Sequence, residues 1–483
     1  MTPRAVSAPA ETLLLLGGAP ARGSGGVLEV IDPYRREVVA HVSRAGLDDL
    51  DRAVGLARSG QKAVAALPVH ARAAILERAA AIVSERREAL ATEVSRQVGK
   101  AFKDTFREAG RVAETLRASA DAARHLHGDG LTADAMSGGE KLIALELRVP
   151  VGVVGAITPY NSPLNLVAHK LGPALAAGNA IILKPASKAP LSALSLAGIL
   201  VEAGMPAPAI SILPGGPDLG TALVAHAGVD FVTLTGSRRA GEQVRDAAGL
   251  KRVTLELGGN SATLVHHDAD VVKAAAALSW GAFANAGQSC NSAQRIFVHA
   301  AIFDAFAAEL ARRAAALVVG DPLDPKSDLG TMVDEGEARR VESWVRDAVA
   351  AGGRLLCGGL RTGAAYQPTV LQDVPEQQPV NCEEVFGPVA VLTRYDDVET
   401  ALASANNTPY GLVGAVFTRS LPLAMMVGRR LEAGVVNVNR PPNYRLDHLP
   451  YGGVKASGLG REGPRYAVEE MTERRMILID AEA

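Results

Sequence analysis

Apolar side chains between residues 45 and 125 recur every three or four positions, with polar residues in the gaps. Leu47, Leu50 and Val54 form one such stripe, and further stripes follow along the chain. A period near 3.6 residues is typical of helices that bury one face. This part of the chain therefore predicts three amphipathic helices.

From residue 151 onward the apolar residues gather into short runs that alternate with helical stretches. This alternation predicts a parallel sheet with helices on both faces. Ligands of such sheets bind at the carboxyl ends of the strands, so the polar groups that end the runs are expected to meet at one rim. These groups are Asn161, Lys184, Gly236-Ser237 and Glu256, and the runs lie at 151–157, 180–183, 210–213, 231–234 and 252–257.

A second alternating pattern extends from Ser261 to about Asn437 and predicts another α/β unit. Two strand-like stretches lie outside both units, at 141–148 and 476–479. We expect them to pair as an arm, within one subunit or between two. About ten residues at the N-terminus are expected to form a loose tail.

The composition excludes several classes of function. Of the 483 residues, 48% are hydrophobic and 21% charged, an ordinary globular balance, and the formal net charge is -2. This charge provides no bulk attraction to nucleic acid or an anionic membrane, and no apolar stretch is long enough to span a bilayer. The three cysteines lack metal-ligand spacing and suit a reducing compartment. We therefore predict a cytoplasmic protein without a metal site.

Cys290 and Glu256 are the strongest candidates for chemistry. Cys290 follows Gly287-Gln288-Ser289, a setting of small and polar residues, and Glu256 ends an apolar run just before Gly258-Gly259. A thiol and a carboxylate beside glycines indicate covalent catalysis with a general base. An isolated cysteine is also a common buried hydrophobe, so at this point both interpretations of Cys290 stay open.

Several further motifs also have more than one interpretation. Asn161, in a loop between prolines, is either an ordinary turn residue or an amide donor to an oxyanion. Lys184 either extends to solvent or binds ribose hydroxyls or a phosphate. Gly236-Ser237 opens a helix and suits a phosphate. Gly458 to Gly463 has the spacing of a dinucleotide fingerprint, but too few residues follow for a βαβ unit, so we expect a turn before a C-terminal helix.

Taken together, the motifs resemble those of the aldehyde dehydrogenase superfamily, from about residue 28 to 480. They occur in order and with suitable spacing, and the chain looks most similar to the branch of lactaldehyde, non-phosphorylating glyceraldehyde-3-phosphate and phosphonoacetaldehyde dehydrogenases. The matching motifs are Thr158-Pro159-Tyr160-Asn161, Lys184-Pro185, Phe231 to Gly241, Glu256 to Gly259, Gly287 to Cys290, Glu384 to Pro388 and Gly452 to Gly460.

The resemblance implies an α/β fold with two parallel-sheet, Rossmann-like domains, one for the cofactor and one catalytic, and a small β oligomerisation arm. A homodimer or homotetramer is expected. The expected boundaries are 1–129 with 150–256 for the NAD(P)-binding domain, 257–437 for the catalytic domain, and 130–149 with 438–483 for the arm and the C-terminal tail.

The resemblance also assigns roles to single residues. Cys290 attacks the aldehyde to give a thiohemiacetal, and Asn161 with the Cys290 N–H holds the oxyanion. Hydride passes to NAD or NADP, and Glu256 activates the water that hydrolyses the thioester. The implied cofactor-binding residues are Thr158, Pro159, Lys184, Ser187, Gly236, Ser237, Gly258, Glu384 and Phe386. The implied substrate-binding residues are Arg111, Tyr160, Ser289 and Arg445.

One departure from the family pattern concerns the cofactor. Many NAD-preferring members have a glutamate where this chain has Ser187. A carboxylate there binds ribose hydroxyls and repels a 2′-phosphate, and serine removes that repulsion. We expect NADP to be used at least as well as NAD, with help from Lys188 or Arg238.

A second departure concerns the substrate. Members that act on phosphorylated or phosphonylated aldehydes tend to have an arginine where this chain has Ser289. Arg111 and Arg445 match positions that face the substrate mouth, and their forked geometry suits an anionic group. Either could instead form a surface salt bridge. We expect a small polar or anionic aldehyde as the substrate.

Three other functions fit parts of the pattern. A CoA-acylating semialdehyde dehydrogenase would pass the thioester to CoA, but relatives of that type often lack the glutamate that is Glu256 here. A cysteine hydrolase without redox chemistry needs a histidine partner, and no histidine in the sequence has a convincing setting. A non-catalytic protein on the same scaffold would have no use for Cys290, Glu256 and Asn161 together.

Overall fold

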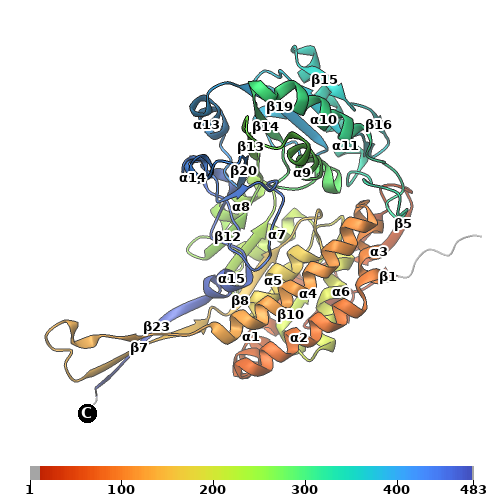
Figure 1. Cartoon of the computed structure of the whole chain (residues 1–483). Helices are drawn as coiled ribbons and strands as arrows, with labels where there is room; N and C mark the ends of the chain where they lie inside the picture. Colours follow the sequence, from red (N-terminus) through yellow and green to blue (C-terminus); the bar gives the residue numbers. More distant parts are fainter. Residues whose placement is uncertain (1–10, 481–483) are drawn as a thin grey trace, which may run out of the picture.

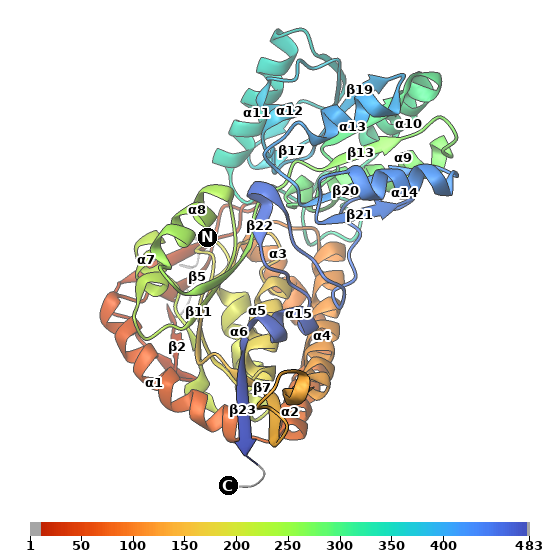
Figure 2. The ribbon, with the colours of Figure 1, turned by 90° about the vertical axis from the view of Figure 1, so that its left-hand side faces the viewer.

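The computed structural model describes residues 11–480, and the expected loose tail at the N-terminus lies outside them. Two α/β units stand one above the other, and a narrow β arm extends from the lower unit (Figure 1). A view turned by 90° separates the same two units clearly (Figure 2). The expected α/β fold, with two Rossmann-like units and a β arm, is thus confirmed.

The first sheet has five parallel strands in its centre and antiparallel strands at its edges. The central strands are almost fully buried, as expected for apolar strands covered on both faces. In spatial order the strands are β22 (Gly458–Leu459), β12 (Arg252–Glu256), β11 (Phe231–Thr235), β8 (Val153–Ile157), β9 (Ala180–Lys184), β10 (Ile210–Ile212), β2 (Leu14–Leu16) and β3 (Ala19–Ala21).

The order of the central strands creates a natural ligand site. The chain winds from β8 through β9 to β10, and then returns to the other side of β8 to form β11 and β12. The carboxyl ends of β8 and β11 therefore form a topological switch point, where loops separate and leave a crevice. Asn161 and Gly236-Ser237 follow these two strands.

Helices cover both faces of the first sheet. α2, α4, α5 and α6 pack together on one face, and α1, α7 and α8 lie on the other. The prediction of three helices between residues 45 and 125 is wrong, because Pro68 and the left-handed Gly99 help to divide the segment into four. The helices are α1 (Leu47–Ala66), α2 (Val69–Glu85), α3 (Arg87–Val98), α4 (Phe102–His125), α5 (Asn165–Ala176), α6 (Pro190–Glu202), α7 (Pro217–Ala225), α8 (Arg238–Ala247) and α15 (Pro464–Glu470).

The second sheet has six parallel strands and one antiparallel edge strand. In spatial order they are β15 (Arg354–Cys357), β18 (Thr369–Gln372), β19 (Val389–Tyr395), β14 (Arg295–His299), β13 (Ala262–Val265), β20 (Val413–Phe417) and β21 (Val435–Val438). Its helices are α9 (Val271–Phe283), α10 (Phe303–Ala315), α11 (Glu335–Ala350), α12 (Pro379–Cys382), α13 (Val398–Asn406) and α14 (Leu421–Arg430).

The C-terminal region does more than form the arm. β22 adds to the edge of the first sheet, where Gly458 pairs with Glu256, and α15 then packs against α4 and α5. The turn expected at Gly458 to Gly463 does lead into this helix. The domain boundaries themselves stay a prediction.

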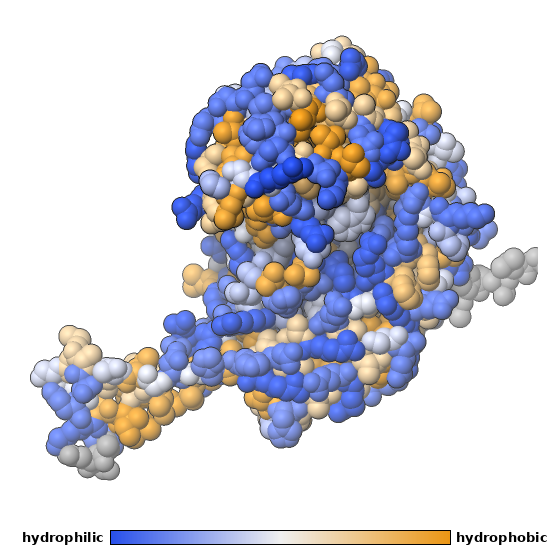
Figure 3. Space-filling model, viewed as in Figure 1, coloured by the Kyte–Doolittle hydropathy of each residue, from blue (hydrophilic) through white to orange (hydrophobic). Residues whose placement is uncertain are grey.

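The arm is an antiparallel ribbon formed within one chain by β6 (Gly130–Leu131), β7 (Leu142–Pro150) and β23 (Thr472–Asp480). In its register Leu145 faces Ile477, and Ile143 faces Ile479. Alternate residues of a strand point to one face, so these four apolar side chains share a surface. All are exposed, and the arm shows orange residues among blue ones in the hydropathy view (Figure 3). Two small sheets, β1 (Glu11–Thr12) with β5 (Val38–Ser43) and β4 (Val27–Ile31), and β16 (Arg361–Thr362) with β17 (Ala365–Tyr366), complete the strands.

Two expected absences can be examined between residues 11 and 480. None of the helices there combines the length and the apolar character that a membrane crossing needs. In the same part of the chain, no group of three or more His, Cys, Asp or Glu side chains is arranged to hold a metal ion.

Candidate active site

Cys290 stands at the end of an unusual turn between the two units. Residues 285–287 adopt left-handed backbone angles, with φ of 56°, 52° and 68°. Such angles cost about 1–3 kcal/mol each for residues other than glycine, and they cluster at functional sites. The Asn285 side chain donates hydrogen bonds to the carbonyls of Asn161, at 2.9 Å, and Gln288, at 3.1 Å. The turn therefore ties the Cys290 loop to the loop that follows β8.

Asn161 is buried beside Cys290 and has an amide partly free for a ligand. Its Nδ2 donates one hydrogen bond to the Gln288 carbonyl at 3.0 Å, and within residues 11–480 its Oδ1 has no partner. Lys100 donates to the Asn161 carbonyl at 3.2 Å and forms a buried ion pair of 2.6 Å with Glu108. Sequence reasoning missed this pair, which fixes the Asn161 loop from α4.

Glu256 is the last residue of β12 and is buried without a hydrogen-bond partner for either oxygen in the described chain. Burial raises the pKa of this carboxyl well above its ordinary value, and the neighbouring carboxylate of Glu462 adds to the effect. Gly452 lies against Glu256, because a Cβ at that position would be 2.8 Å from the Oε1 atom. A carboxyl without fixed partners in a dry site is free to accept a proton.

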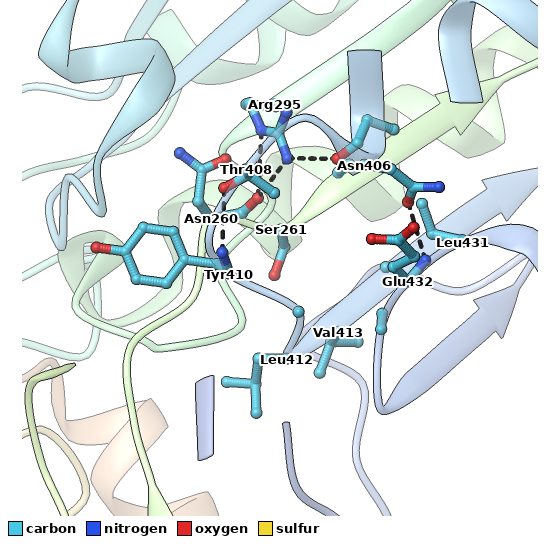
Figure 4. A pocket seen from close by; sticks show the side chains of 15 residues that line it. Asn260, Ser261, Arg295, Asn406, Thr408, Tyr410, Leu412, Val413, Leu431 and Glu432 are labelled. Carbon is cyan, nitrogen blue, oxygen red and sulfur yellow. Dashed lines mark hydrogen bonds between the residues drawn. The ribbon is translucent and has the colours of Figure 1, made fainter. Parts of the chain in front are cut away.

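Gly259 brings the Glu256 segment next to the nucleophile. A Cβ atom at Gly259 would be 2.2 Å from the Cys290 carbonyl oxygen, so only glycine allows this approach. The next residue after Gly259 is Asn260. The buried Arg295 donates to the Asn260 carbonyl from Nε at 3.3 Å and from Nη2 at 3.1 Å (Figure 4). Its guanidinium also bonds the carbonyls of Ser404 and Ala405. The turn after β12 is thereby anchored to the second unit.

Two cavities meet at Cys290. One has a volume of about 350 Å³ and the other of about 250 Å³, and Asn161, Leu166 and Cys290 line both. Burial raises the pKa of the Cys290 thiol to about 12. Because Cys290 lines both cavities, a group bound in one cavity can react, through this thiol, with a group bound in the other.

The smaller cavity opens at the switch point. Ser237 is the N-cap of α8, and its side chain accepts from the Ala240 N–H at 3.3 Å. Glu384 accepts from the Gly259 N–H at 3.0 Å, and burial raises its pKa to about 7. Six predicted cofactor residues line this cavity, namely Pro159, Gly236, Ser237, Gly258, Glu384 and Phe386.

Tyr160 also lines the smaller cavity, and not the larger one for which it was predicted. Its ring contacts the Phe386 ring edge-on, with centroids 6.0 Å apart. Phe386 has a left-handed φ of 46°, which directs its ring into this contact. The structure thus moves Tyr160 from the expected substrate side to the expected cofactor side.

Thr158, Lys184 and Ser187 do not line the smaller cavity but lie along the same edge of the sheet. The Thr158 N–H donates to the Lys184 carbonyl at 3.2 Å, and Ser187 Oγ donates to the Gly215 carbonyl at 3.1 Å. Burial lowers the pKa of Lys184. A dinucleotide is long enough to extend from the cavity along this edge, so these residues fit its distal half.

The larger cavity has a wall with four cationic side chains, here called the cationic wall, each of them paired with a carboxylate. Lys100, Arg107, Arg111 and Arg445 line it, against the carboxylates of Asp104 and Glu108. Arg111 binds Asp447 through Nε, at 2.8 Å, and Nη2, at 2.7 Å, so its other terminal amino group is not used by this pair. The Arg111 side chain keeps 32% of its surface exposed. An anionic ligand could therefore bind Arg111 without breaking the ion pair.

Arg445 is more enclosed than Arg111. Its guanidinium lies 4.0 Å above the Tyr451 ring and 3.3 Å from a Glu462 oxygen. Asp447, buried between the arginines, is also bonded to His169 at 3.0 Å. Arg111 and Arg445 thus both form salt bridges, as one interpretation of the sequence expected. Both also line the larger cavity. Ser289 lines it too, with its hydroxyl bonded to Asn291 at 2.6 Å.

The residues of the smaller cavity fit a nicotinamide dinucleotide. The cavity lies at the switch point, next to a helix N-terminus that favours a phosphate. Within the described chain, the buried hydroxyl of Thr158 has no partner at this edge. Gly258 leaves room there for the Glu384 carboxyl, because a Cβ atom at this position would lie 2.5 Å from a Glu384 oxygen. A thiol and a carboxylate facing such a crevice are the arrangement of a nicotinamide-dependent oxidoreductase.

The sequence pattern of the aldehyde dehydrogenase family matches residues 21–477. The chain belongs to this family and is an oxidoreductase that acts on aldehydes with NAD or NADP. The expected resemblance, including the branch that contains lactaldehyde and glyceraldehyde-3-phosphate dehydrogenases, is confirmed.

Three similar proteins illustrate the relationship. The 3-sulfolactaldehyde dehydrogenase of Priestia aryabhattai is 44% identical over 454 residues, which cover 94% of this chain and 95% of the relative. The structure of aldehyde dehydrogenase 21 from Physcomitrella patens, in complex with the reaction product succinate, has a TM-score of 0.95 and 36% identity, covering 98% and 99% of the two chains. The glyceraldehyde-3-phosphate dehydrogenase GapN of Methanocaldococcus jannaschii, complexed with NADP, has a TM-score of 0.91 and 36% identity, covering 95% and 100%.

Proposed function

We propose that this protein oxidises a small anionic aldehyde to the carboxylic acid through a thioester on Cys290. The observation that carries the proposal is the meeting of two cavities at Cys290 and Asn161, one at the switch point and one with a cationic wall. Cofactor and aldehyde can thus approach the same thiol from opposite sides. Held in this geometry, they react without the entropic cost of a bimolecular encounter.

The smaller cavity would hold the nicotinamide half of the cofactor. Ser237 and the N-terminus of α8 favour the pyrophosphate, and Glu384 with Phe386 would meet the nicotinamide ribose and ring. Lys184 and Ser187 would meet the adenine ribose. When bound, the nicotinamide supplies a hydride acceptor.

The larger cavity would hold the aldehyde with its carbonyl carbon at the Cys290 thiol. The thiolate adds to this carbon, and the carbonyl oxygen takes the negative charge. The second N–H of the Asn161 amide and the Cys290 N–H would donate to this oxyanion. Loss of hydride from the same carbon then leaves a thioester on Cys290.

Glu256 would complete the reaction by activating water. Its carboxylate takes a proton from a water molecule, and the resulting hydroxide attacks the thioester carbon. The carbon–sulfur bond breaks, and the acid and the Cys290 thiolate are released. Because burial raises the pKa of Glu256, this step requires a pH high enough to ionise the carboxyl, so its rate should rise with pH.

An anionic group on the substrate is supported by the cationic wall and by the relatives. A sulfonate, a carboxylate and a phosphate are the charged groups named in the three similar proteins: sulfolactaldehyde, succinate and glyceraldehyde-3-phosphate. The terminal amino group of Arg111 that does not bind Asp447 is available to a charged group of the substrate, and Arg111 lines the same cavity as Cys290. Ser289 leaves space beside the nucleophile that an arginine would fill.

The test is a panel of aldehydes assayed with NAD and NADP, with Cys290→Ala as the blank. We expect short aldehydes that carry a sulfonate, phosphate or carboxylate to have a higher kcat/KM than hexanal or benzaldehyde. Arg111→Met should lower kcat/KM for the anionic aldehydes by about 10- to 100-fold, the value of a charge-assisted hydrogen bond, and change that for propanal little.

The matched control is Arg394→Met, which removes an arginine paired with Asp304 away from both cavities. Higher activity on hexanal or benzaldehyde than on every anionic aldehyde would contradict the proposed substrate class. An equal loss on all aldehydes in Arg111→Met would show that this arginine supports the fold instead of binding the substrate.

For the cofactor, we infer that NADP is used at least as well as NAD. Ser187 brings no carboxylate to the adenine ribose, and Arg44, which sequence reasoning missed, lies near this edge, within 2.9 Å of a Cβ built on Gly216. Lys188 and Arg238, the expected helpers, are paired with Asp334 and Glu242. Arg44 is also paired, with Asp218 at 3.2 Å, but it lies near enough to Lys184 to help lower the pKa of that ammonium group, after the larger effect of burial.

Ser187→Glu should reverse this preference. A carboxylate facing a 2′-phosphate is repelled, and we expect the ratio of kcat/KM for NADP to that for NAD to fall by about 10- to 100-fold. Steady-state kinetics with both cofactors measures the ratio, and Ser187→Ala, which adds no charge, should change it little. A strong preference of the unaltered enzyme for NAD, or an unchanged ratio in Ser187→Glu, would contradict the inference.

We also propose that the arm joins two or four copies of the chain. Ile143, Leu145, Ile477 and Ile479 together leave an apolar surface in solvent on an element that extends away from the body (Figure 3). Exposed apolar patches of this kind mark association sites.

A further inference from the structure

A segment near the C-terminus contacts both Cys290 and Glu256. Tyr451 is 5% exposed and lies with its hydroxyl 3.6 Å from the Cys290 sulfur. The next residue, Gly452, lies against the Glu256 carboxyl, and Gly458 pairs with the Glu256 backbone. One short segment thus contacts both reacting groups of the proposed mechanism.

The Tyr451 hydroxyl is the one side-chain group within hydrogen-bonding distance of the Cys290 thiol among residues 11–480. Three charged groups also influence this thiol. Glu384 and Glu256 disfavour the thiolate, whereas Arg445 favours it. Burial is the largest effect and opposes ionisation. The thiolate therefore needs a donor, and this structure offers one.

We propose that Tyr451 is a catalytic residue whose hydroxyl donates a hydrogen bond to the Cys290 thiolate and holds it ready for attack. The inference rests on the proposed function only in taking Cys290 as the nucleophile. The thiol proton leaves the sulfur for a base, either Glu256 or solvent, and Tyr451 keeps its own proton throughout. When the sulfur bonds to the aldehyde carbon, the hydrogen bond to the thiolate is lost and the hydroxyl remains neutral.

Three observations make Tyr451 suited to this role. Its backbone is held on both sides by Glu462, since the Tyr451 N–H donates at 3.0 Å to the Glu462 carbonyl and its own carbonyl accepts at 2.7 Å from the Glu462 N–H. Its ring is held by the Arg445 guanidinium at 4.0 Å. Burial also raises the pKa of Tyr451 well above its ordinary value, so the hydroxyl stays protonated and remains a donor.

The inference can be tested without aldehyde or cofactor, by measuring how fast iodoacetamide alkylates Cys290 as a function of pH. Mass spectrometry locates the modified residue, and Cys290→Ala provides the blank. Tyr451→Phe removes one oxygen and keeps the ring on Arg445. Below the thiol pKa the alkylation rate follows the fraction of thiolate, so we expect the rate at a given pH to fall by about 10- to 100-fold, because a hydrogen bond to a charged group is lost.

Tyr395→Phe is the matched control, because it deletes a hydroxyl that bonds His266 at 3.0 Å, away from both cavities. Its alkylation profile should equal that of the unaltered enzyme. Thermal unfolding of each variant shows that the comparison is made on folded protein.

The outcomes separate this inference from the proposed function. An alkylation rate that is unchanged in Tyr451→Phe would overturn the inference, even if the enzyme oxidises aldehydes. A slower rate at each pH would support it, even if no aldehyde in the panel is oxidised. In an active enzyme, Tyr451→Phe should also move the acidic limb of the pre-steady-state burst to higher pH.

Discussion

Replacement of Cys290 by alanine is expected to abolish aldehyde oxidation, with kcat lower by a factor of about 10⁴ or more. The thiol is the nucleophile that attacks the aldehyde in the proposed mechanism, and it lies where the two cavities meet. Binding of the cofactor should persist, because the residues that would hold it stay in place. Absorbance of the reduced cofactor measures turnover, and fluorescence titration measures cofactor affinity.

Cys357 provides the matched control, as a partly buried cysteine outside both cavities. Cys357→Ala should keep the activity of the unaltered enzyme. Residual turnover in Cys290→Ala above about one per cent would mean that oxidation proceeds without the thioester, and the mechanism would then be wrong.

Replacement of Glu256 by glutamine should separate the two halves of the reaction. The reduced cofactor should still appear in a burst of one equivalent per active site, and steady turnover should fall by about 10²- to 10⁴-fold, the usual contribution of a general base. The amide cannot take a proton from water, so the thioester accumulates. Rapid mixing records the burst, and mass spectrometry of the quenched enzyme records the acyl group on Cys290.

The pH dependence provides a second readout for Glu256. Thioester hydrolysis in the unaltered enzyme should rise with pH through the raised pKa of this carboxyl, and the variant should lose that rise. Glu462 is the matched neighbour. Burial opposes its ionisation, but Lys170 at 2.5 Å and nearby cations lower its pKa to about 2, so it stays ionised and cannot produce the same limb.

Addition of CoA to the Glu256 variant distinguishes the two acyl acceptors. An enzyme that uses water should form no acyl-CoA, either before or after the substitution. Rapid formation of acyl-CoA would favour the CoA-acylating alternative, and an absent burst would place Glu256 before hydride transfer instead of after it.

The sequence alone predicted the sheets and the residues at their ends, because both depend on local patterns. Short apolar runs predicted β8 to β12, and the rule that parallel strands end at one edge placed Asn161, Gly236 and Glu256 together. The helical region was less well predicted. Four helices formed where three were expected, although Pro68 and Gly99 are local signals that mark two of the breaks.

Contacts across long stretches of the chain could not be predicted. Tyr451 touches Cys290 from 161 positions away, and nothing in the Tyr451-Gly452-Gly453 turn indicates that partner. Aspartate and lysine are usually exposed, so the sequence does not indicate that Asp447 and Lys100 are buried. In the fold Asp447 is the buried partner of Arg111, and Lys100 is the buried partner of Glu108. Tyr160 was predicted to bind the substrate, but it lines the smaller cavity, where its ring contacts Phe386 from a distant part of the chain.

The pairing of β22 with β12 has a consequence for how the enzyme is made. The strand that ends in Glu256 obtains its neighbour on this side only when residues 458–459 have been synthesised, some 200 positions later. A chain still on the ribosome would keep that edge open, with neither the segment that covers Glu256 nor the tyrosine that faces the thiol. Such a late closure is slow, because it brings together distant parts of the chain. A newly synthesised chain should therefore stay catalytically silent until residues 458–459 have emerged and paired with β12.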